Sequence, residues 1–331
     1  MIIQTRSYPR AALLGNPSDG YFGRTIAFPF RNFSATVTLY ESPELEIIPA
    51  DYDSNVFYSI QELSEDVEFY GYYGGIRLLK AAVKRFYQYC LDQGKDIHGK
   101  NFTIRYDSDI PYRLGLAGSS AIITACIKAL MKFYDVNIPR HELANLVLAV
   151  ETEELKITAG LQDRVVQAFN CPVYMDFDRA FMEKMGYGIY EPMDKKLFKN
   201  LYIAYQTDLS QGSEVVHNDF RERFHFGVEE VLHAIQQWSD ITVKGKKAIE
   251  SGDRDELDEL INLNFDIRKS VMNISRKNIE MVEIARSAGA SAKFTGSGGA
   301  IIGLYRDDKM YAELKESLQP YKIAILKPRI V

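Results

Sequence analysis

The spacing of hydrophobic and polar residues predicts strands in the first third of the chain. Residues 33–40 alternate between the two classes and are rich in β-branched side chains, and residues 45–48 continue in that style. A helix is expected over 74–91, because its apolar residues recur on one face while lysines and arginines fall off that face. Residues 102–106 then predict a short strand, which is followed by an apolar helix over 122–133.

The rest of the chain predicts more helix than strand, and residues 177–198 are charged and irregular. The expected elements are a helix over 141–155, strands over 171–176 and 201–205, helices over 226–288 with a turn at 251–253, and finally a strand, a helix and a strand over 299–305, 307–318 and 322–326. Because strands and helices do not alternate regularly, an α+β architecture is favoured over a doubly wound one. We place a domain boundary near residue 197, which gives domains 1–197 and 198–331.

Composition narrows the class of protein without naming an activity. With 331 residues, 46% of them hydrophobic and 26% charged, the chain is expected to be a soluble protein of one or two domains. A net charge of −5 argues against a nucleic-acid partner. There is neither an apolar run of membrane-spanning length nor a signal-type segment at the start, so we expect a cytoplasmic enzyme. Cys90, Cys126 and Cys171 are widely separated, which predicts reduced thiols rather than disulfides or a zinc site.

The most informative segment is the run 111–121, where a turn built on Gly115 and Gly118 opens into the predicted apolar helix. The first turn of a helix leaves backbone N–H groups unpaired and carries a partial positive charge, so it binds anions. Small residues let a polyphosphate approach that backbone closely, and the Ser120 hydroxyl could reach a phosphate-bound Mg²⁺. An ordinary capped core helix would show the same residue types, and this segment alone does not separate the two readings.

Two further segments are rich in glycine. A strand that begins at Arg10 runs into a turn in which Asn16, Ser18 and Asp19 offer hydrogen-bonding groups to a hydroxylated ligand, although turns of this composition are common. Residues 293–300 form a glycine loop before an apolar strand, and such a loop can direct backbone N–H groups at phosphate oxygens. This loop fits neither a Rossmann fingerprint nor a P-loop.

Acidic residues supply the candidate base and metal ligand. Asp163 follows a glycine within apolar surroundings, a placement that suits a general base. Glu151, Glu153 and Glu154 end the helix expected over 141–155, where carboxylates oppose the helix dipole. They therefore indicate either a local cation or basic partner, or a solvated acidic face.

Together these segments resemble the GHMP kinases, the family of galactokinase, homoserine kinase, mevalonate kinase and phosphomevalonate kinase. The central family motif, Gly-Leu-Gly-Ser-Ser-Ala after a proline, is matched by 111–121 with one extra residue, and the first and third motifs are echoed by 10–19 and 293–300. The chain looks most like the members that phosphorylate glucuronate. That likeness rests on 13–23, 115–122, 159–165 and 264–268, of which 13–23 discriminates best because heptose kinases share Gly-x-Gln-Asp.

The resemblance implies a two-domain GHMP kinase fold, with an N-terminal domain like domain 2 of ribosomal protein S5 and a ferredoxin-like C-terminal domain. It implies transfer of the γ-phosphoryl group of ATP, with Mg²⁺, to the anomeric hydroxyl of D-glucuronate. The alternatives are a family member acting on a heptose, galactose or fucose, and a catalytically dead sensor, against which the retention of Arg10, Ser120 and Asp163 speaks. The expected partners are the sugar and ATP, without nucleic acid or membrane, in a monomer or homodimer.

The resemblance also implies roles for individual residues. The phosphates would lie on Gly115, Leu116, Ala117, Gly118, Ser119, Ser120, Gly296 and Gly298. Mg²⁺ would be held by Ser120 and Glu151, in preference to Glu154. Asp163 would take the hydroxyl proton beside Arg10, and the sugar hydroxyls would bind Asn16, Ser18 and Asp19. The sugar carboxylate calls for a basic residue, for which Arg113 and Arg268 are joined by the further candidates Arg164, Arg221, Arg223 and Lys269.

Overall fold

The computed structural model describes residues 1–50, 53, 57, 59–61, 63, 74–207 and 217–331. It divides into two compact units that interleave along the chain. The first comprises Met1–Pro9, Phe33–Ile110 and Gly118–Ala168, and the second comprises Arg10–Asn32, Pro111–Ala117 and Phe169–Val331. These units are made of several chain segments each, so they do not correspond to one boundary near residue 197. The division into family domains 1–197 and 198–331 stays a prediction.

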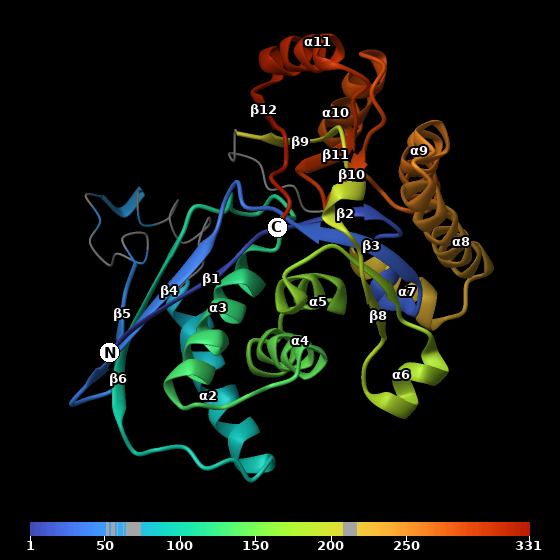
Figure 1. The fold of residues 1–331 in the computed structure, drawn as a ribbon. Coiled ribbons are helices and arrows are strands. Elements are labelled where there is room, and N and C mark those ends of the chain that lie inside the picture. The colour runs from blue at the N-terminus through green and yellow to red at the C-terminus, as the bar shows by residue number, and fades with distance from the viewer. Residues whose placement is uncertain (51–52, 54–56, 58, 62, 64–73, 208–216) are drawn as a thin grey trace. The chain divides into compact units, whose positions relative to one another are not determined.

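One face of a four-stranded sheet supports the helices of the first unit. The strands are, in spatial order, β1 (Ile2–Ser7), β4 (Ala35–Ser42), β6 (Asn101–Ser108) and β5 (Glu46–Ile48). All pairs are antiparallel except β5 with β6, and β4 alternates between buried and half-buried positions as its sequence predicted. Helix α3 (Gly118–Phe133) packs on β1 and β4, and α2 (Ile76–Asp92) packs on α3 (Figure 1).

Two details of the helices in this unit matter for the site. Helix α3 begins at Gly118, four residues before the predicted start at residue 122, so both serines of the central motif lie in its first turn. Helix α4 (Arg140–Ala149) continues into a π-helical turn, Val150–Glu154, and α5 (Leu161–Phe169) follows. A π-turn inserts one residue into the helical repeat and redirects the side chains after it. Glu151 lies in this turn and is fully buried.

The second unit contains two antiparallel sheets. One has the order β2 (Arg10–Leu14), β3 (Arg24–Pro29), β7 (Val173–Asp176) and β8 (Ile189–Pro192), and the other has the order β10 (Lys293–Phe294), β11 (Ala300–Leu304), β9 (Leu201–Gln206) and β12 (Ile323–Leu326). The expectation that 177–198 is irregular was wrong, because α6 (Arg179–Met185) and β8 lie there. Neither element buries a full apolar face, so neither left a periodic signal.

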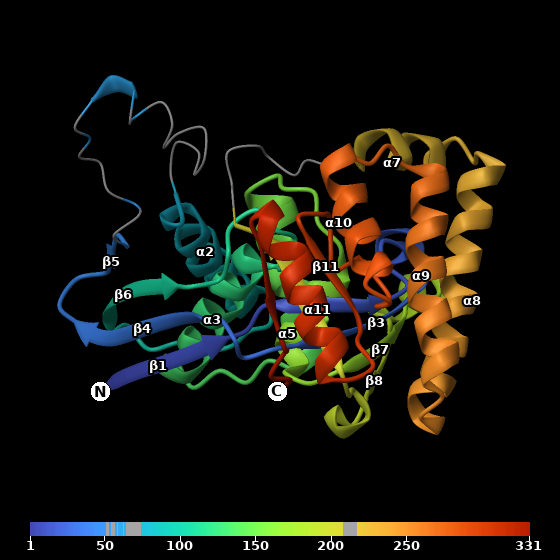
Figure 2. The ribbon, with the colours of Figure 1, turned by 90° about the horizontal axis from the view of Figure 1, so that it is seen from above.

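The region expected to be helical, 226–288, contains the three helices α8 (Glu229–Ser251), α9 (Arg254–Val271) and α10 (Arg276–Ser287). A further helix, α7 (His217–His225), precedes this region. The predicted turn at 251–253 is confirmed, and Figure 2 shows α8 and α9 side by side on either side of it. Gly252 there has a φ of 78°, and the Asp253 side chain caps α9 by accepting from the Glu256 amide at 3.1 Å.

A shared hydrophobic core joins α10 and α11 (Asp308–Leu318) to the β9–β12 sheet. Met281 and Leu314 from the two helices pack with Tyr202 and Phe294 of the sheet, and Phe265 of α9 meets Phe294 edge to face at 5.2 Å. The architecture mixes helices and sheets without regular alternation, so the α+β prediction is confirmed.

Two other expectations concern what the chain does not contain. The three cysteines form no disulfide with one another, and Cys90 and Cys126 are buried while Cys171 is half-buried. Within the described ranges, no helix combines the length and apolar character needed to cross a bilayer.

Candidate active site

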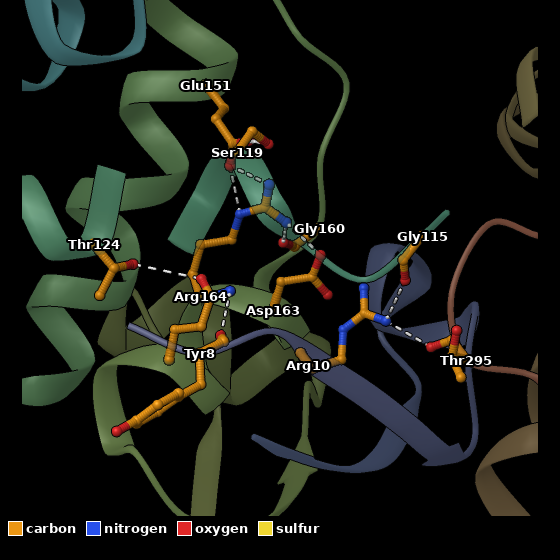
Figure 3. A network of polar contacts seen from close by, with 11 residues as sticks. Tyr8, Arg10, Gly115, Ser119, Thr124, Glu151, Gly160, Asp163, Arg164 and Thr295 are labelled. Atoms are coloured by element: carbon orange, nitrogen blue, oxygen red, sulfur yellow. Dashed lines mark hydrogen bonds and ion pairs between the residues drawn. The ribbon is translucent and has the colours of Figure 1, made fainter. Parts of the chain in front are cut away.

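Arg10 brings the three glycine-rich segments together within the second unit. It is the first residue of β2, and its amide donates to the Leu116 carbonyl at 3.0 Å. Its buried guanidinium donates through Nη1 to the Gly115 carbonyl at 3.1 Å and to the Thr295 carbonyl at 2.6 Å (Figure 3). Segments separated by up to 285 positions therefore converge on one side chain.

The turn at Gly115 and the loop at Gly296 touch through their backbones. Gly115 has a φ of 65°, and a Cβ built there would lie 2.8 Å from the Ser297 amide nitrogen. A Cβ on Gly296 would overlap the Gly115 carbonyl oxygen and lie 2.9 Å from Arg10 Nη1. Both positions therefore require glycine for close packing, and Gly115 requires it also for its left-handed backbone.

Arg268 holds the second loop from α9. Its side chain is 1% exposed, Nη1 donates to the Gly296 carbonyl at 2.8 Å, and Nη2 donates to the Ser297 carbonyl at 3.3 Å. Its guanidinium carbon lies 5.1 Å from the Phe294 ring centre. Burial lowers the pKa of Arg268 to about 10, while Asp19 and Tyr21 act against that shift. Since Arg268 is buried and both terminal nitrogens donate to carbonyls of the loop, the role that the structure supports for it is to position the loop.

The turn after β2 is fixed by interior contacts. Asn264 accepts from the Gly15 amide at 2.7 Å and donates to the Asn16 carbonyl at 3.0 Å. The buried Asn16 side chain accepts from Lys293 Nζ and donates to the Phe294 carbonyl at 3.4 Å. Ser18 is also buried and donates to the Arg24 carbonyl at 3.0 Å. Of the three residues expected to bind the sugar, only Asp19 is partly exposed, and the sugar contacts stay a prediction.

Lys293 and Asn264 are structural members of this site that the sequence argument did not assign. Lys293 is almost completely buried, donates to the Ala12 carbonyl at 2.9 Å, and has a pKa well below its usual value because of burial and the nearby Arg268 and Arg10. The sequence did contain a signal for Asn264. Asn264 and Arg268 fall four residues apart on the apolar stripe of α9, where an unpaired polar residue would be costly.

A second polar cluster belongs to the first unit and centres on Arg164 (Figure 3). Glu151 accepts through Oε1 from the Ser119 hydroxyl at 2.7 Å and through Oε2 from Arg164 Nε at 2.7 Å. Arg164 Nη1 donates to the Gly160 carbonyl at 2.8 Å and lies 3.2 Å from Asp163 Oδ2. Arg164 therefore organises two carboxylates, so its guanidinium is already occupied by protein groups rather than open to a substrate carboxylate.

The residues around Glu151 suit a magnesium ion that is shared with phosphates. Magnesium takes oxygen ligands and in kinases uses one or two carboxylates together with the nucleotide. Among the described residues there is no group of three or more histidines, cysteines or acidic residues that could hold a metal by themselves. The hydroxyl seen on Glu151 is that of Ser119, whereas Ser120 is fully buried. One carboxylate with an adjacent hydroxyl fits this mode of binding.

The remaining candidates for the sugar carboxylate differ in their surroundings. Two have acidic partners: Arg223 lies 2.9 Å from Glu230, and Lys269 lies 3.3 Å from Glu283. Arg113 has a left-handed backbone with a φ of 55° and lies 5.7 Å from the ring centre of its neighbour Tyr112. Arg221 is exposed and hydrogen-bonds Tyr21.

One predicted pairing stays a prediction. Arg10 belongs to the second compact unit and Asp163 to the first.

Comparison with known proteins identifies relatives along nearly the whole chain. The family model for the GHMP kinases N-terminal domain matches residues 77–170, and that for the GHMP kinases C-terminal domain matches residues 246–320. The chain is 41% identical to glucuronokinase 1 of Arabidopsis thaliana, over 97% of this chain and 92% of that protein. It is 44% identical to probable glucuronokinase 2 of the same organism, over 91% of this chain and 84% of that protein.

Solved structures share the fold at much lower sequence identity. Galactokinase of Lactococcus lactis, complexed with galactose, matches with a TM-score of 0.79 at 16% identity, over 99% of this chain and 93% of that one. Mevalonate kinase of Methanococcus jannaschii matches with a TM-score of 0.71 at 18% identity, over 100% of this chain and 98% of that one. At such identities the likeness shows the fold alone.

Proposed function

Because this chain belongs to the GHMP kinases, we propose that it transfers the γ-phosphoryl group of ATP to the anomeric hydroxyl of D-glucuronate, giving glucuronate 1-phosphate. The observation that carries the choice of sugar is the similarity, over nearly the whole chain, to two proteins named as glucuronokinases. We expect the enzyme to work in the cytoplasm as a monomer or homodimer.

The triphosphate is assigned to the first turn of α3 and the turn that leads into it. Gly118, Ser119 and Ser120 begin α3, where unpaired amides and the helix dipole favour anions. In the second unit, the carbonyl oxygens of Gly115 and Gly296 accept hydrogen bonds from Arg10 and Arg268, which hold these two backbone segments in place for the proposed contact with phosphate. Leu116, Ala117 and Gly298 complete the proposed phosphate-binding segments.

Glu151 and a serine hydroxyl are the residues that we propose as magnesium ligands. When bound, Mg²⁺ would neutralise negative charge on the phosphate oxygens. The hydrogen bond from Ser119 to Glu151 favours Ser119 as the hydroxyl ligand, whereas Ser120 is the ligand that the family resemblance implies. Arg164, held against the other oxygen of Glu151, fixes the direction of that carboxylate.

Asp163 is the proposed general base. It accepts the proton of the anomeric hydroxyl as the sugar oxygen bonds to the γ-phosphorus and the bond from that phosphorus to the bridging oxygen of ADP breaks. Arg164 Nη1, 3.2 Å from Asp163 Oδ2, stabilises the charged carboxylate that this role needs. We propose that Arg10 adds positive charge at the same step.

The first prediction tests this assignment with Asp163→Asn. The variant should lose about 10²- to 10⁴-fold in kcat with glucuronate, because it cannot accept the proton, while its affinity for ATP stays close to that of the wild type. Glucuronate 1-phosphate is measured by phosphorus NMR and ATP affinity by calorimetry. Wild-type turnover in the variant would remove Asp163 from the role of base.

A panel of sugars separates the proposed activity from the alternatives. Purified enzyme with ATP and Mg²⁺ is offered glucuronate, galactose, fucose and a heptose, and product formation is compared. Phosphorylation of a neutral sugar with none on glucuronate would reject the proposed substrate and keep the kinase. No turnover with any sugar, together with retained ATP binding, would favour the sensor.

A further inference from the structure

A uronate differs from the corresponding hexose at C6, where it carries a carboxylate in place of a hydroxymethyl group. Recognition of that group therefore calls for a cation that is open to solvent and whose charge is not already neutralised, and an arginine is suited to bind both oxygens at once. Arg268 and Lys293 are buried and hydrogen-bonded to protein carbonyl groups, and Arg164, Arg223 and Lys269 lie against carboxylates. This inference rests on the proposed function, because it concerns the residue that binds the carboxylate of the proposed substrate.

Helix α7 packs against the turn that carries the predicted sugar-binding residues. The contact is made by Tyr21, the last residue of the 3₁₀ turn Ser18–Tyr21. Its ring meets Phe220 edge to face at 5.1 Å and Phe224 edge to face at 5.0 Å. These phenylalanines lie four residues apart and so share one face of α7. The position of α7 next to this turn is thereby fixed by three aromatic rings.

Arg221 follows Phe220 and reaches back to the same tyrosine. Its guanidinium hydrogen-bonds the Tyr21 side chain while the residue stays exposed to solvent. Asp19 and Arg268 also lie within electrostatic range of the Tyr21 hydroxyl. Burial raises the pKa of Tyr21, so this partner is a neutral hydroxyl at physiological pH. A neutral partner orients the guanidinium without cancelling its positive charge.

We propose that Arg221 binds the C6 carboxylate of glucuronate, with Tyr21 positioning the guanidinium. The partly exposed Asp19, two residues before Tyr21 in the same turn, is then placed to accept hydrogen bonds from hydroxyl groups of the same sugar. The turn and α7 together would distinguish a charged sugar from a neutral one. Arg221 acts here in binding and takes no part in the transfer of the phosphoryl group.

The second prediction is a change of substrate preference in Arg221→Gln. Its kcat/KM for glucuronate should fall about 10- to 100-fold, mainly through a higher KM, because a hydrogen-bonded charge pair is lost. Glucuronamide has the same shape as glucuronate without the charge, so its kcat/KM should change far less. Arg221→Lys keeps the charge but loses the planar guanidinium group. Its kcat/KM for glucuronate should therefore lie between that of the wild type and that of Arg221→Gln. The measured quantity is the ratio of kcat/KM for the acid to that for the amide.

Two further variants control for general effects. Arg276→Gln makes the same charge change at an exposed residue of α10, paired with Glu280 at 2.8 Å, and should leave the acid-to-amide ratio unchanged. Tyr21→Phe removes only the hydroxyl that positions Arg221, so the KM for glucuronate should rise while that for ATP does not. If Arg221→Gln fails to fold, Arg221→Lys alone decides through the same ratio.

The outcome also separates this inference from the proposed function. A wild-type ratio in both Arg221 variants, with glucuronate still phosphorylated, would overturn the inference and leave the function intact. A wild-type enzyme that phosphorylates no uronate would instead overturn the proposed function itself.

Discussion

Single cationic side chains hold the glycine-rich backbone in place. Arg10, Arg268 and Lys293 are all buried, and each donates to main-chain carbonyl oxygens of these segments. Burying a charge is costly unless hydrogen bonds replace water, and here main-chain carbonyls provide that replacement.

Lys128 on α3 provides the third prediction, a pH dependence of stability. Its ammonium donates to the Gln167 carbonyl at 2.8 Å, and burial, Arg140 and Lys132 lower its pKa to about 8. The unfolded chain keeps this proton up to about pH 10.5, so between these values it binds more protons than the folded protein. The free energy of unfolding should therefore rise with pH across that window.

The comparison that isolates this effect uses Lys128→Met. The free energy of unfolding is measured with urea from about pH 7 to about pH 10 for both proteins. The value for wild type minus that for the variant should increase with pH, by at most about 1.4 kcal/mol per pH unit. A difference that stays flat over this range would show that Lys128 keeps an ordinary pKa in the folded protein.

Residue types revealed candidate chemistry, but not the direction in which each side chain points. Asp163 and Glu151 could be selected because carboxylates stand out beside a glycine segment and at a helix end. Asn16 and Ser18 have the right chemistry for a sugar, yet their groups bond to Lys293 and Arg24 inside the protein. The orientation of Asn16 depends on a residue 277 positions away, which no local pattern contains, whereas Ser18 turns back onto the strand that follows its own turn.

At the scale of elements, the contact between the Gly115 turn and the Gly296 loop leads to the fourth prediction. Gly296→Ala should cost about 1–3 kcal/mol in the free energy of unfolding, because the new methyl group overlaps the Gly115 carbonyl and crowds Arg10. The same variant should raise the KM for ATP. Both quantities follow from urea unfolding and steady-state kinetics.

Gly99→Ala is the matched control for this change. A Cβ at Gly99 would meet no atom within 4 Å, and the variant should differ from wild type by less than about 0.5 kcal/mol. Equal stability and ATP kinetics in both variants would mean that the two segments are not packed as described.

Long periodic elements were predictable, and short or exposed ones were not. The strands β4 and β9 and the helices α2, α8 and α9 lie close to their expected ranges, because each buries a continuous stripe or alternating face. Helix α6 buries no residue and β8 is mostly exposed, so their sequences carried no period. The π-turn that contains Glu151 could not be predicted either, since it adds one residue to the helical repeat without changing the apolar pattern of the sequence.

At the scale of the whole molecule, the chain crosses between its two compact units several times. One such crossing lies within the segment that we propose to bind phosphate, since Pro111–Ala117 belongs to the second unit and α3 begins the next stretch of the first. A nucleotide that binds the folded protein and not the unfolded chain stabilises the fold by mass action. Ligand binding is therefore expected to stabilise the molecule as a whole.

The fifth prediction measures this linkage. ATP with Mg²⁺ at about 100 times its dissociation constant should add about 2.7 kcal/mol to the free energy of unfolding of wild type. Asp163→Asn should show the same increase, because the proposed base does not hold the nucleotide, whereas Gly296→Ala should show less. A wild-type protein whose unfolding is unaffected by ATP would contradict nucleotide binding.

The hydrogen bonds of Arg10 to two separate peptide segments have a consequence for protein engineering. Replacing one of the three segments with its counterpart from another kinase would present the guanidinium with a foreign carbonyl on one side and a native one on the other. Chimeras should therefore exchange all three segments as one block, and libraries that randomise a single segment will sample mostly mismatched combinations.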